Sequence, residues 1–279
     1  MNKGIFRLKV FHRRRAACKT VAVISALSLL ALTPVTALAA PVALTGSADV
    51  LANVNGGASI SGVTGSMTLD TDLTTANINL TSGGAGLINW SALNIGAGQK
   101  LGFTGGDFYN VVGGADASKI AGQLNAGGSL WIFNPAGVSF MSGSQVTVGG
   151  LFSVAAAGLE NESTIKDAIN GGTVIPSPVL AESAAAVSVA SGAKFIVGGD
   201  MALVGQSVGI ESGADLSKVS SLKVAAGQKV DIDDVGGGRV SLDISQFTDV
   251  DDDINVTFGG GDPADINVGD ADHAGDVKS

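Results

Sequence analysis

Hydrophobic and polar residues alternate in short runs along most of the chain after residue 58, and Gly, Asn, Asp and Ser interrupt these runs. Alternation with a period of two is typical of β-strands, whose successive side chains point to opposite faces of a sheet. The interruptions recur too closely for helices to connect the strands, so the pattern predicts an all-β fold. Only residues 163–169 hint at a helical turn. The clearest alternating runs are residues 58–60, 76–80, 145–148, 186–189, 194–197 and 239–244.

Two segments of the C-terminal half resemble each other. Residues 201–208 read MALVGQSV and residues 222–230 read LKVAAGQKV, at an offset of 21 that grows to 22 after Ala226. Such a period lies in the range of solenoids, in which each coil buries its apolar face against the next coil. The repeat therefore favours a parallel β-helix with ladders of Val, Ile and Leu inside and Gly and Asn at its corners. The same alternation also allows an antiparallel sandwich.

The composition narrows the chemistry. Gly provides 41 of the 279 residues, aromatic residues make up 5% and charged residues 15%, so turns must be frequent and the core must be mainly aliphatic. The sequence holds one Cys and two His. Because zinc sites and Cys or His nucleophile systems need clusters of these residues, we expect neither an enzyme nor a bound cofactor.

The N-terminal segment has the layout of a secretory signal peptide. Seven basic residues and no acid precede an apolar run at residues 21–32, which is too short to span a bilayer. Small residues follow it, and we expect export by the Sec route with cleavage near Ala39 or Ala40.

Removal of residues 1–39 changes the charge balance. The remaining chain has 9 basic against 25 acidic residues, a formal charge of −16, and no Cys. Such a surface repels phosphates and anionic lipid heads, so we expect no nucleic acid partner. We also expect no membrane span after signal removal, because no later stretch is long and apolar enough.

Several motifs follow one another over some sixty residues in the middle of the sequence. Trp90 leads into Asn94, Ile95 and Gly96, residues 118–128 read SKIAGQLNAGG, and residues 130–140 read LWIFNPAGVSF. This order resembles the N-terminal secretion domain of filamentous haemagglutinin-type exoproteins, in which a Trp leads into a Phe-Asn-Ile-Gly segment. Later residues resemble the coils that follow in that family, so the likeness covers roughly residues 45–245.

The resemblance implies a right-handed parallel β-helix with an N-terminal cap, exported by two-partner secretion through an outer-membrane pore protein that recognises the domain. It further implies a Gram-negative envelope and a secreted or surface-exposed, adhesin-like product that contacts a host or neighbouring cell. We accordingly expect a signal peptide at residues 1–39, a secretion domain at residues 40–245 and an acidic Gly- and Asp-rich tail at residues 246–279.

The resemblance also points to candidate recognition residues, namely Asn94 and Ile95 together with Asn134, Pro135 and Gly137. The last three belong to Asn-Pro-Ala-Gly, which matches the family's Asn-Pro-Asn-Gly motif except at the third position. Asn, Pro and Gly at these positions favour a type I turn, which the Ala tolerates. Two interpretations stay open: the motif only shapes a corner, or the transporter reads it. We expect Trp90 and Trp131 to be core residues.

The C-terminal end is strongly acidic. From residue 231 onward there are thirteen Asp against one Arg and one Lys. Asp clusters bind Ca²⁺ when a turn brings several together, but neither an EF-hand loop nor an intact Gly-rich calcium repeat is present, so a solvated tail is favoured.

Two further functions stay open. One is a polysaccharide-active β-helical enzyme; it would need two carboxylates opposed across a groove, and Asp231, Asp233 and Asp234 show no such pair in the sequence. The other is the N-terminal remnant of a longer adhesin or contact-dependent toxin.

Overall fold

The computed structural model describes residues 42–44, 58–63, 67–71, 75–80, 84–246, 256–258 and 277–278. The predicted signal peptide at residues 1–39 lies outside these residues. Within the described ranges, no helix is long and apolar enough to cross a membrane.

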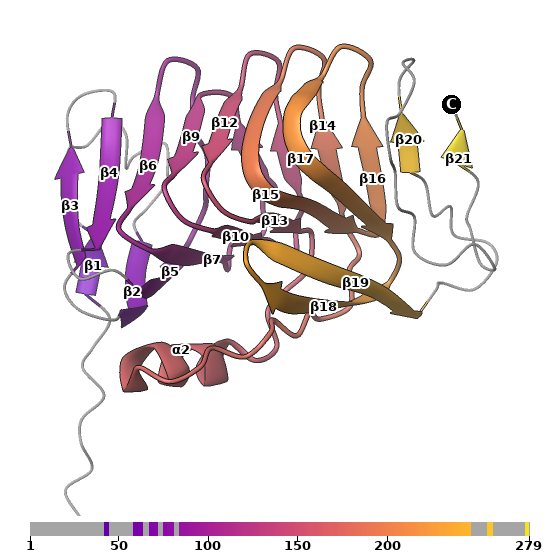
Figure 1. Cartoon of the computed structure of the whole chain (residues 1–279). Helices are drawn as coiled ribbons and strands as arrows, with labels where there is room; N and C mark the ends of the chain where they lie inside the picture. Colours follow the sequence, from indigo (N-terminus) through magenta and orange to yellow (C-terminus); the bar gives the residue numbers. More distant parts are fainter. Residues whose placement is uncertain are drawn as a thin grey trace, which may run out of the picture. The chain divides into compact units, whose positions relative to one another are not determined.

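The described chain is almost entirely β-structure, arranged in two large sheets and one hairpin (Figure 1). The first sheet contains thirteen strands: β1 (Val42–Leu44), β2 (Ala58–Val63), β3 (Met67–Thr71), β4 (Thr75–Leu80), β5 (Ala85–Trp90), β6 (Lys100–Thr104), β7 (Asp107–Val112), β9 (Gln123–Ala126), β10 (Leu130–Phe133), β12 (Gln145–Val148), β13 (Phe152–Ala155), β15 (Lys194–Gly205) and β17 (Asp215–Ala226).

The second sheet contains six strands: β8 (Ser118–Ile120), β11 (Val138–Phe140), β14 (Ala186–Val189), β16 (Ser207–Ile210), β20 (Val256–Phe258) and β21 (Val277–Lys278). The remaining two strands, β18 (Lys229–Gly236) and β19 (Arg239–Gln246), form the antiparallel hairpin, and the described helix is α2 (Glu162–Gly171).

Parallel pairing at a near-constant residue spacing makes the two large sheets a solenoid. Leu130 in β10 pairs with Phe108 one coil earlier and with Phe152 one coil later, at 22 residues in each direction. Met201 pairs with Leu222 at the 21-residue offset of the sequence repeat. The predicted all-β parallel β-helix is confirmed, and the antiparallel sandwich is excluded for these strands.

The first half of the sequence repeat stacks, but the second half does not. Residues 201–205 of β15 pair in register with residues 222–226 of β17. The expected next pair would join β16 to β18, whereas β16 pairs with β20 and β18 folds back on β19. In β18 the buried Val230 and Ile232 alternate with exposed Asp231. These apolar residues cover the outside of the solenoid rather than its interior.

The interior of the solenoid is a ladder of apolar side chains from successive coils. Phe108, Leu130, Phe152 and Met201 are fully buried, one above the other. Phe140 brings its ring 5.1 Å from that of Phe195 and 6.0 Å from that of Phe152. Trp90 is also buried here, and its indole N–H donates to Asn110 Oδ1 over 2.9 Å. The prediction that Trp90 belongs to the core is confirmed.

A second core lies on the outer side of strands β5, β7, β10, β13 and β15. Trp131 is buried there between the rings of Tyr109 and Phe133, at 5.8 and 6.2 Å. Helix α2 and the hairpin β18–β19 cover this side of the sheet, seen along the lower side of the molecule in Figure 1. Strand β10 is therefore buried on both faces, and Trp131 is a core residue as predicted.

Helix α2 corrects the expectation of no more than a helical turn. It runs ten residues and buries Ile165, Ala168 and Ile169, the spacing of one helical face. Gly172 ends it in the left-handed conformation at φ 62°. The helix belongs to an excursion between β13 and β14, and for this reason Phe152 pairs with Met201 49 residues onward instead of 22.

The two ends of the described solenoid lie near the predicted N-terminal cap and the predicted acidic tail. At the N-terminal end β2 pairs antiparallel with β5, and β3 with β4; the N-terminal cap itself stays a prediction. At the C-terminal end, β20 and β21 lie within the predicted tail and extend the second sheet in parallel, with Val256 opposite Val277.

Candidate recognition site at strand β8

The two candidate motifs, 40 residues apart in the sequence, contact the same short strand. Asn94 and Ile95 lie on one side of β8. The side-chain Oδ1 of Asn94 accepts a hydrogen bond from the Lys119 N–H over 2.8 Å. The Ile95 N–H donates to the Lys119 carbonyl over 2.9 Å, and Ile95 forms a parallel bridge with Ile120. This segment thus supplies one edge of the β8 ladder.

Asn134 lies on the other side of β8, and its carboxamide is fully buried. Its Nδ2 donates to the Ser118 hydroxyl over 2.9 Å and to the Asp116 carbonyl over 3.2 Å. Its Oδ1 accepts the Ala136 N–H over 2.9 Å. One side chain therefore fixes both its own turn and the start of β8, since a buried amide needs all its partners satisfied.

The Asn-Pro-Ala-Gly segment is a four-residue turn, as expected. The Gly137 N–H donates to the Asn134 carbonyl over 2.9 Å, and the Gly137 carbonyl accepts the Ser118 N–H at the same distance. Gly137 has φ 103°, and a Cβ there would lie 2.8 Å from the Ala186 carbonyl oxygen. Pro135 is exposed and Ala136 half-buried. Glycine is needed at the fourth position, whereas the third could hold a larger side chain.

An open groove runs beside β8 on the surface. Its lining comes from residues on both sides of the strand: Asn94, Ile95, Gly96, Asp116, Ala117, Lys119, Ala121 and Met141. The groove encloses about 690 Å³. Met141 is 42% exposed although it is apolar. The groove thus combines small apolar side chains with one carboxylate and one ammonium group.

Sequence reasoning identified the two motifs but not the strand between them. Asp116, Ser118 and Lys119 were not among the expected site residues, although Ser118 and Lys119 begin the segment SKIAGQLNAGG of the family resemblance. Their position between the two motifs depends on the coil register, which pairs Ser118 with Val138. The sequence alone does not give that register.

The hairpin is tied to the solenoid by a buried charge. Asp200 in β15 lies 2.8 Å from the Lys223 ammonium in β17 and accepts the Val240 N–H of β19 over 3.0 Å. Burial acts to raise the pKa of Asp200, but the bonds from Lys223 and Val240 outweigh it and hold that pKa below its ordinary value. In the second core, burial together with Asp107 and Asp234 raises the pKa of the Tyr109 hydroxyl.

The hairpin brings two carboxylates opposite each other, but not across a groove. Asp231 stands directly opposite Asp243 in the antiparallel register. Both are exposed, and they share an open strand pair rather than two walls of a groove. In the part of the chain that the structure describes, no group of three or more His, Cys, Asp or Glu could hold a metal ion.

A parallel β-solenoid with these motifs at adjacent coils defines a class, the secreted exoproteins of two-partner secretion systems. Family comparison agrees: the model of the TPS secretion domain matches residues 68–262. The chain belongs to this family, whose members are recognised by an outer-membrane transporter and are secreted or surface-exposed.

Individual relatives are similar over shorter stretches. The Heme/hemopexin-binding protein of Haemophilus influenzae is 33% identical over 103 residues, which cover 36% of this chain and 10% of that protein. The crystal structure of the HMW1 secretion domain from Haemophilus influenzae superposes with a TM-score of 0.48 at 17% identity, covering 67% of this chain and 49% of that one. The chain therefore spans about a tenth of the curated relative's length.

Proposed function

We propose that the transporter recognises this exoprotein at the corner around β8. The observation that carries the proposal is that Asn94–Ile95 and Asn134–Gly137 hydrogen-bond to opposite edges of one three-residue strand. The groove beside that strand presents Asp116, Lys119 and Met141 to solvent. A docking segment could pair with these charges and cover the exposed thioether.

Because Asn134 is buried, it could act in one of two ways: by positioning β8 in the folded domain, or by contacting the transporter before the domain folds. In the folded domain its carboxamide is inaccessible, so there it acts as a positioning residue for β8. Direct contact between the transporter and this side chain would have to take place before the corner folds. The outward groove residues, in contrast, are accessible after folding.

We further propose that the product is an adhesin-like binding protein of the cell surface and has no catalytic activity. The support is its family, together with the name of the relative that binds haem and hemopexin. We also propose the three-part organisation: a signal peptide at residues 1–39, the secretion domain and the acidic tail. Calcium binding by that tail stays a prediction.

The test measures export in cells that carry the cognate outer-membrane pore. Asn94→Ala, Asn134→Ala and Lys119→Glu are compared with Ser188→Ala, which changes an exposed residue of β14 two strands away from β8. Blots of medium, surface and periplasm give the exported fraction. We expect the first three variants to export at least about tenfold less than wild type, a change of about 1.4 kcal/mol in recognition, and Ser188→Ala to export normally.

A melting curve of each refolded variant separates recognition from folding. Lys119→Glu is the decisive variant, because its side chain points outward and should leave the melting temperature unchanged. Normal export of Lys119→Glu and Asn94→Ala in correctly folded form would contradict recognition at this corner.

A further inference from the structure

We propose that a second exposed surface, the outward side of strands β6, β9 and β12 and of residues 194–197 of β15, binds a linear acidic polysaccharide. We call it the amide face. The proposal goes beyond export, because this face lies on a different part of the coil from β8 and its neighbours.

The amide face is flat and polar. In β9, β12 and residues 194–197 of β15, buried apolar residues alternate with exposed or half-exposed residues, whereas in β6 Lys100 is exposed and Gly102 is buried. Parallel register aligns these outward residues in two rows that run across the strands. One row is Lys100, Gln123, Gln145 and Lys194; the other is Gly102, Asn125, Thr147 and Ile196. Neighbouring rungs lie about 4.8 Å apart, so the two lysines stand about 14 Å from each other.

The polar groups of this face are free for a ligand. In the described residues, no hydrogen bond engages the side chains of Gln123, Asn125, Gln145 or Thr147. By contrast, on the second sheet Ser188 donates to Ser139 over 2.8 Å. Amides that both donate and accept suit the hydroxyl groups of sugars, and Ile196, 44% exposed, offers an apolar contact for a sugar ring.

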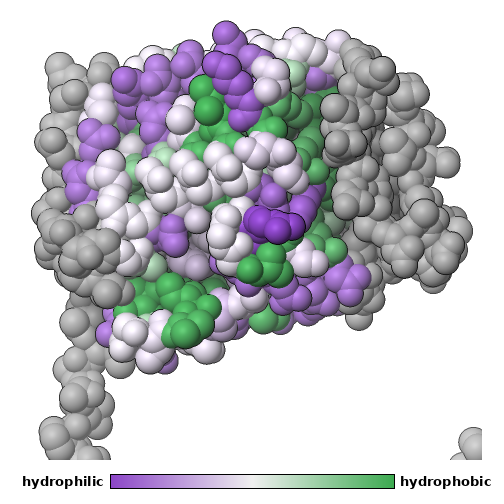
Figure 2. All heavy atoms as spheres, viewed as in Figure 1, coloured by the Kyte–Doolittle hydropathy of each residue, from purple (hydrophilic) through white to green (hydrophobic). Residues whose placement is uncertain are grey.

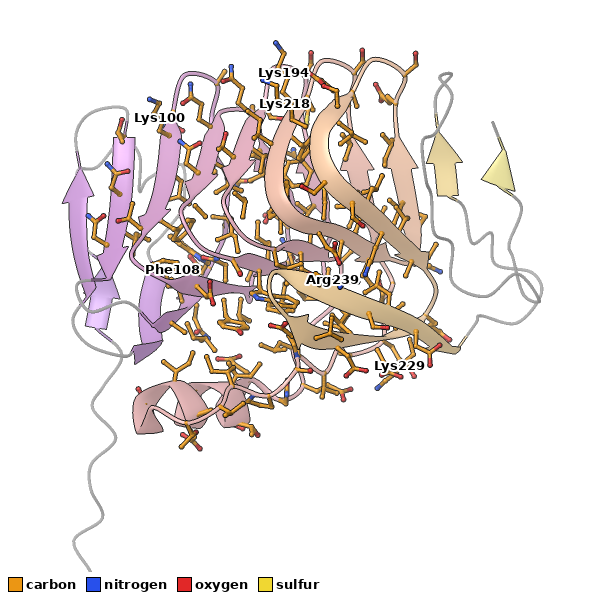
Figure 3. The ribbon with its side chains drawn as sticks, viewed as in Figure 1. Lys100, Phe108, Lys194, Lys218, Lys229 and Arg239 are labelled. Carbon is orange, nitrogen blue, oxygen red and sulfur yellow. The ribbon has the colours of Figure 1, made fainter. Side chains whose placement is uncertain are left out.

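Charge is distributed unevenly around the solenoid. Lys100, Lys194 and Lys218 lie along one side of the molecule (Figure 3). Asp215 of β17 stands directly opposite Lys194 in the parallel register and offsets part of its charge; the pKa of Asp215 is lowered chiefly by Ser217. On the opposite side, α2 and the hairpin carry Glu and Asp at six positions, 162, 167, 231, 233, 234 and 243, and Glu160 lies just before α2.

An overall acidic protein therefore presents one face that is locally basic. Acids on the far side are screened, because the Debye length at physiological salt is about 8 Å. In the same view the upper strands carry mainly hydrophilic residues (purple) and small apolar patches (Figure 2). Nucleic acid fits less well, because this face has no aromatic side chain for base stacking and few cations for a dense phosphate backbone.

Binding is tested on the exported protein purified from culture medium. The probes are dextran sulfate, polygalacturonate and neutral dextran at an ionic strength of about 0.05 M. We expect the protein to bind at least one polyanion and to be released by salt; the sulfate and carboxylate polymers show which anion it prefers. Binding to neutral dextran of equal strength, or to neither polyanion, would overturn the proposal.

Two matched double variants locate the site. Lys100→Gln/Lys194→Gln should weaken binding about tenfold, because it removes two exposed ammonium groups from the face. Lys166→Gln/Arg239→Gln changes the net charge equally, on α2 and the hairpin, and should change affinity less than twofold. An equal loss in both would show non-specific charge attraction and reject the site.

A third variant keeps the charge constant. Gln123→Ala/Gln145→Ala should weaken polysaccharide binding about threefold or more, with the melting temperature unchanged. Unaltered affinity in this variant, or tighter binding to single-stranded DNA than to either polysaccharide, would refute the assignment to a sugar polymer.

Discussion

At the scale of single residues, the corner at β8 depends on backbone conformation as much as on side chains. Gly137 combines φ 103° with a neighbouring carbonyl where a Cβ would lie. Two causes disfavour a side chain at this position: the positive φ, which residues other than Gly rarely adopt, and the short distance between a Cβ and the neighbouring carbonyl oxygen. The family motif thus ends in Gly for a structural reason that holds whether or not the transporter contacts it.

The first prediction concerns Gly137→Ala. We expect it to destabilise the domain by about 2–4 kcal/mol, from backbone strain plus displacement of the Ala186 carbonyl. Chemical denaturation of the purified protein measures this. Gly127→Ala serves as control, because that glycine has no positive φ and a Cβ there meets nothing within 4 Å. Equal stability of the two variants would disprove the explanation.

The second prediction concerns Asp200, which is 6% exposed. Because its pKa is lower in the folded state than in the unfolded state, its stabilisation is present above about pH 4 and is lost as the pH falls through the folded value. Asp200→Asn should cost about 1–3 kcal/mol at pH 7, since Lys223 loses its partner. Below pH 4 the difference from wild type should shrink.

The measurement is the free energy of unfolding between pH 3 and 7 for wild type, Asp200→Asn and Asp243→Asn. The last variant changes an exposed carboxylate of the same hairpin and should show a small effect. A constant gap between wild type and Asp200→Asn over this range would argue against the ion pair as the cause.

At the scale of elements, helix α2 and the hairpin β18–β19 act as one cover over the second core. The hairpin contacts the segments that flank α2: the Asp234 N–H donates to the Ser177 hydroxyl over 3.1 Å, and Lys229 lies 3.5 Å from Glu160. The buried Ser183 hydroxyl donates to the Ala156 carbonyl over 2.6 Å, and its N–H donates to the Gln228 carbonyl. Hydrogen bonds therefore join the hairpin to the segment between β13 and β14 that contains α2.

The third prediction tests this cover. Ile165→Ala removes a fully buried side chain of α2 and should cost about 2–4 kcal/mol if the helix unfolds together with the solenoid. Thr164→Ala, at an exposed helix position, is the control. Hydrogen exchange should show lost protection in residues 162–171 and in β18. Loss confined to α2 would mean that the two excursions are independent.

The sequence was informative about the solenoid and uninformative about its cover. Alternation and the 21-residue repeat gave the strands and the register of Met201 with Leu222, because these depend on local pattern. The burial of β10 on both faces could not be predicted from the sequence. Trp131 and Phe133 indicate a buried face, but they do not show which face of the sheet it is or that the other face is also covered. The juxtaposition of Asn94 with Asn134 around β8 required the full coil register, which depends on loop lengths between strands.

At the scale of the whole molecule, coil stacking fits export through a pore. Parallel pairs between successive coils join residues about 22 apart, so each coil can fold on the one before it as the chain emerges. The sequence after residue 39 has no Cys, so no disulfide closes a loop that would have to be threaded. The sequence after residue 39 has 25 acidic and 9 basic residues, and a net charge far from zero opposes aggregation.

The most direct test is fractionation of cells with and without the cognate outer-membrane pore gene, blotting for this protein in medium, cell surface and periplasm. The account predicts that the protein reaches the medium or surface only when the pore gene is intact, and stays in the periplasm when it is deleted. Equal export in both strains would contradict two-partner secretion of this chain.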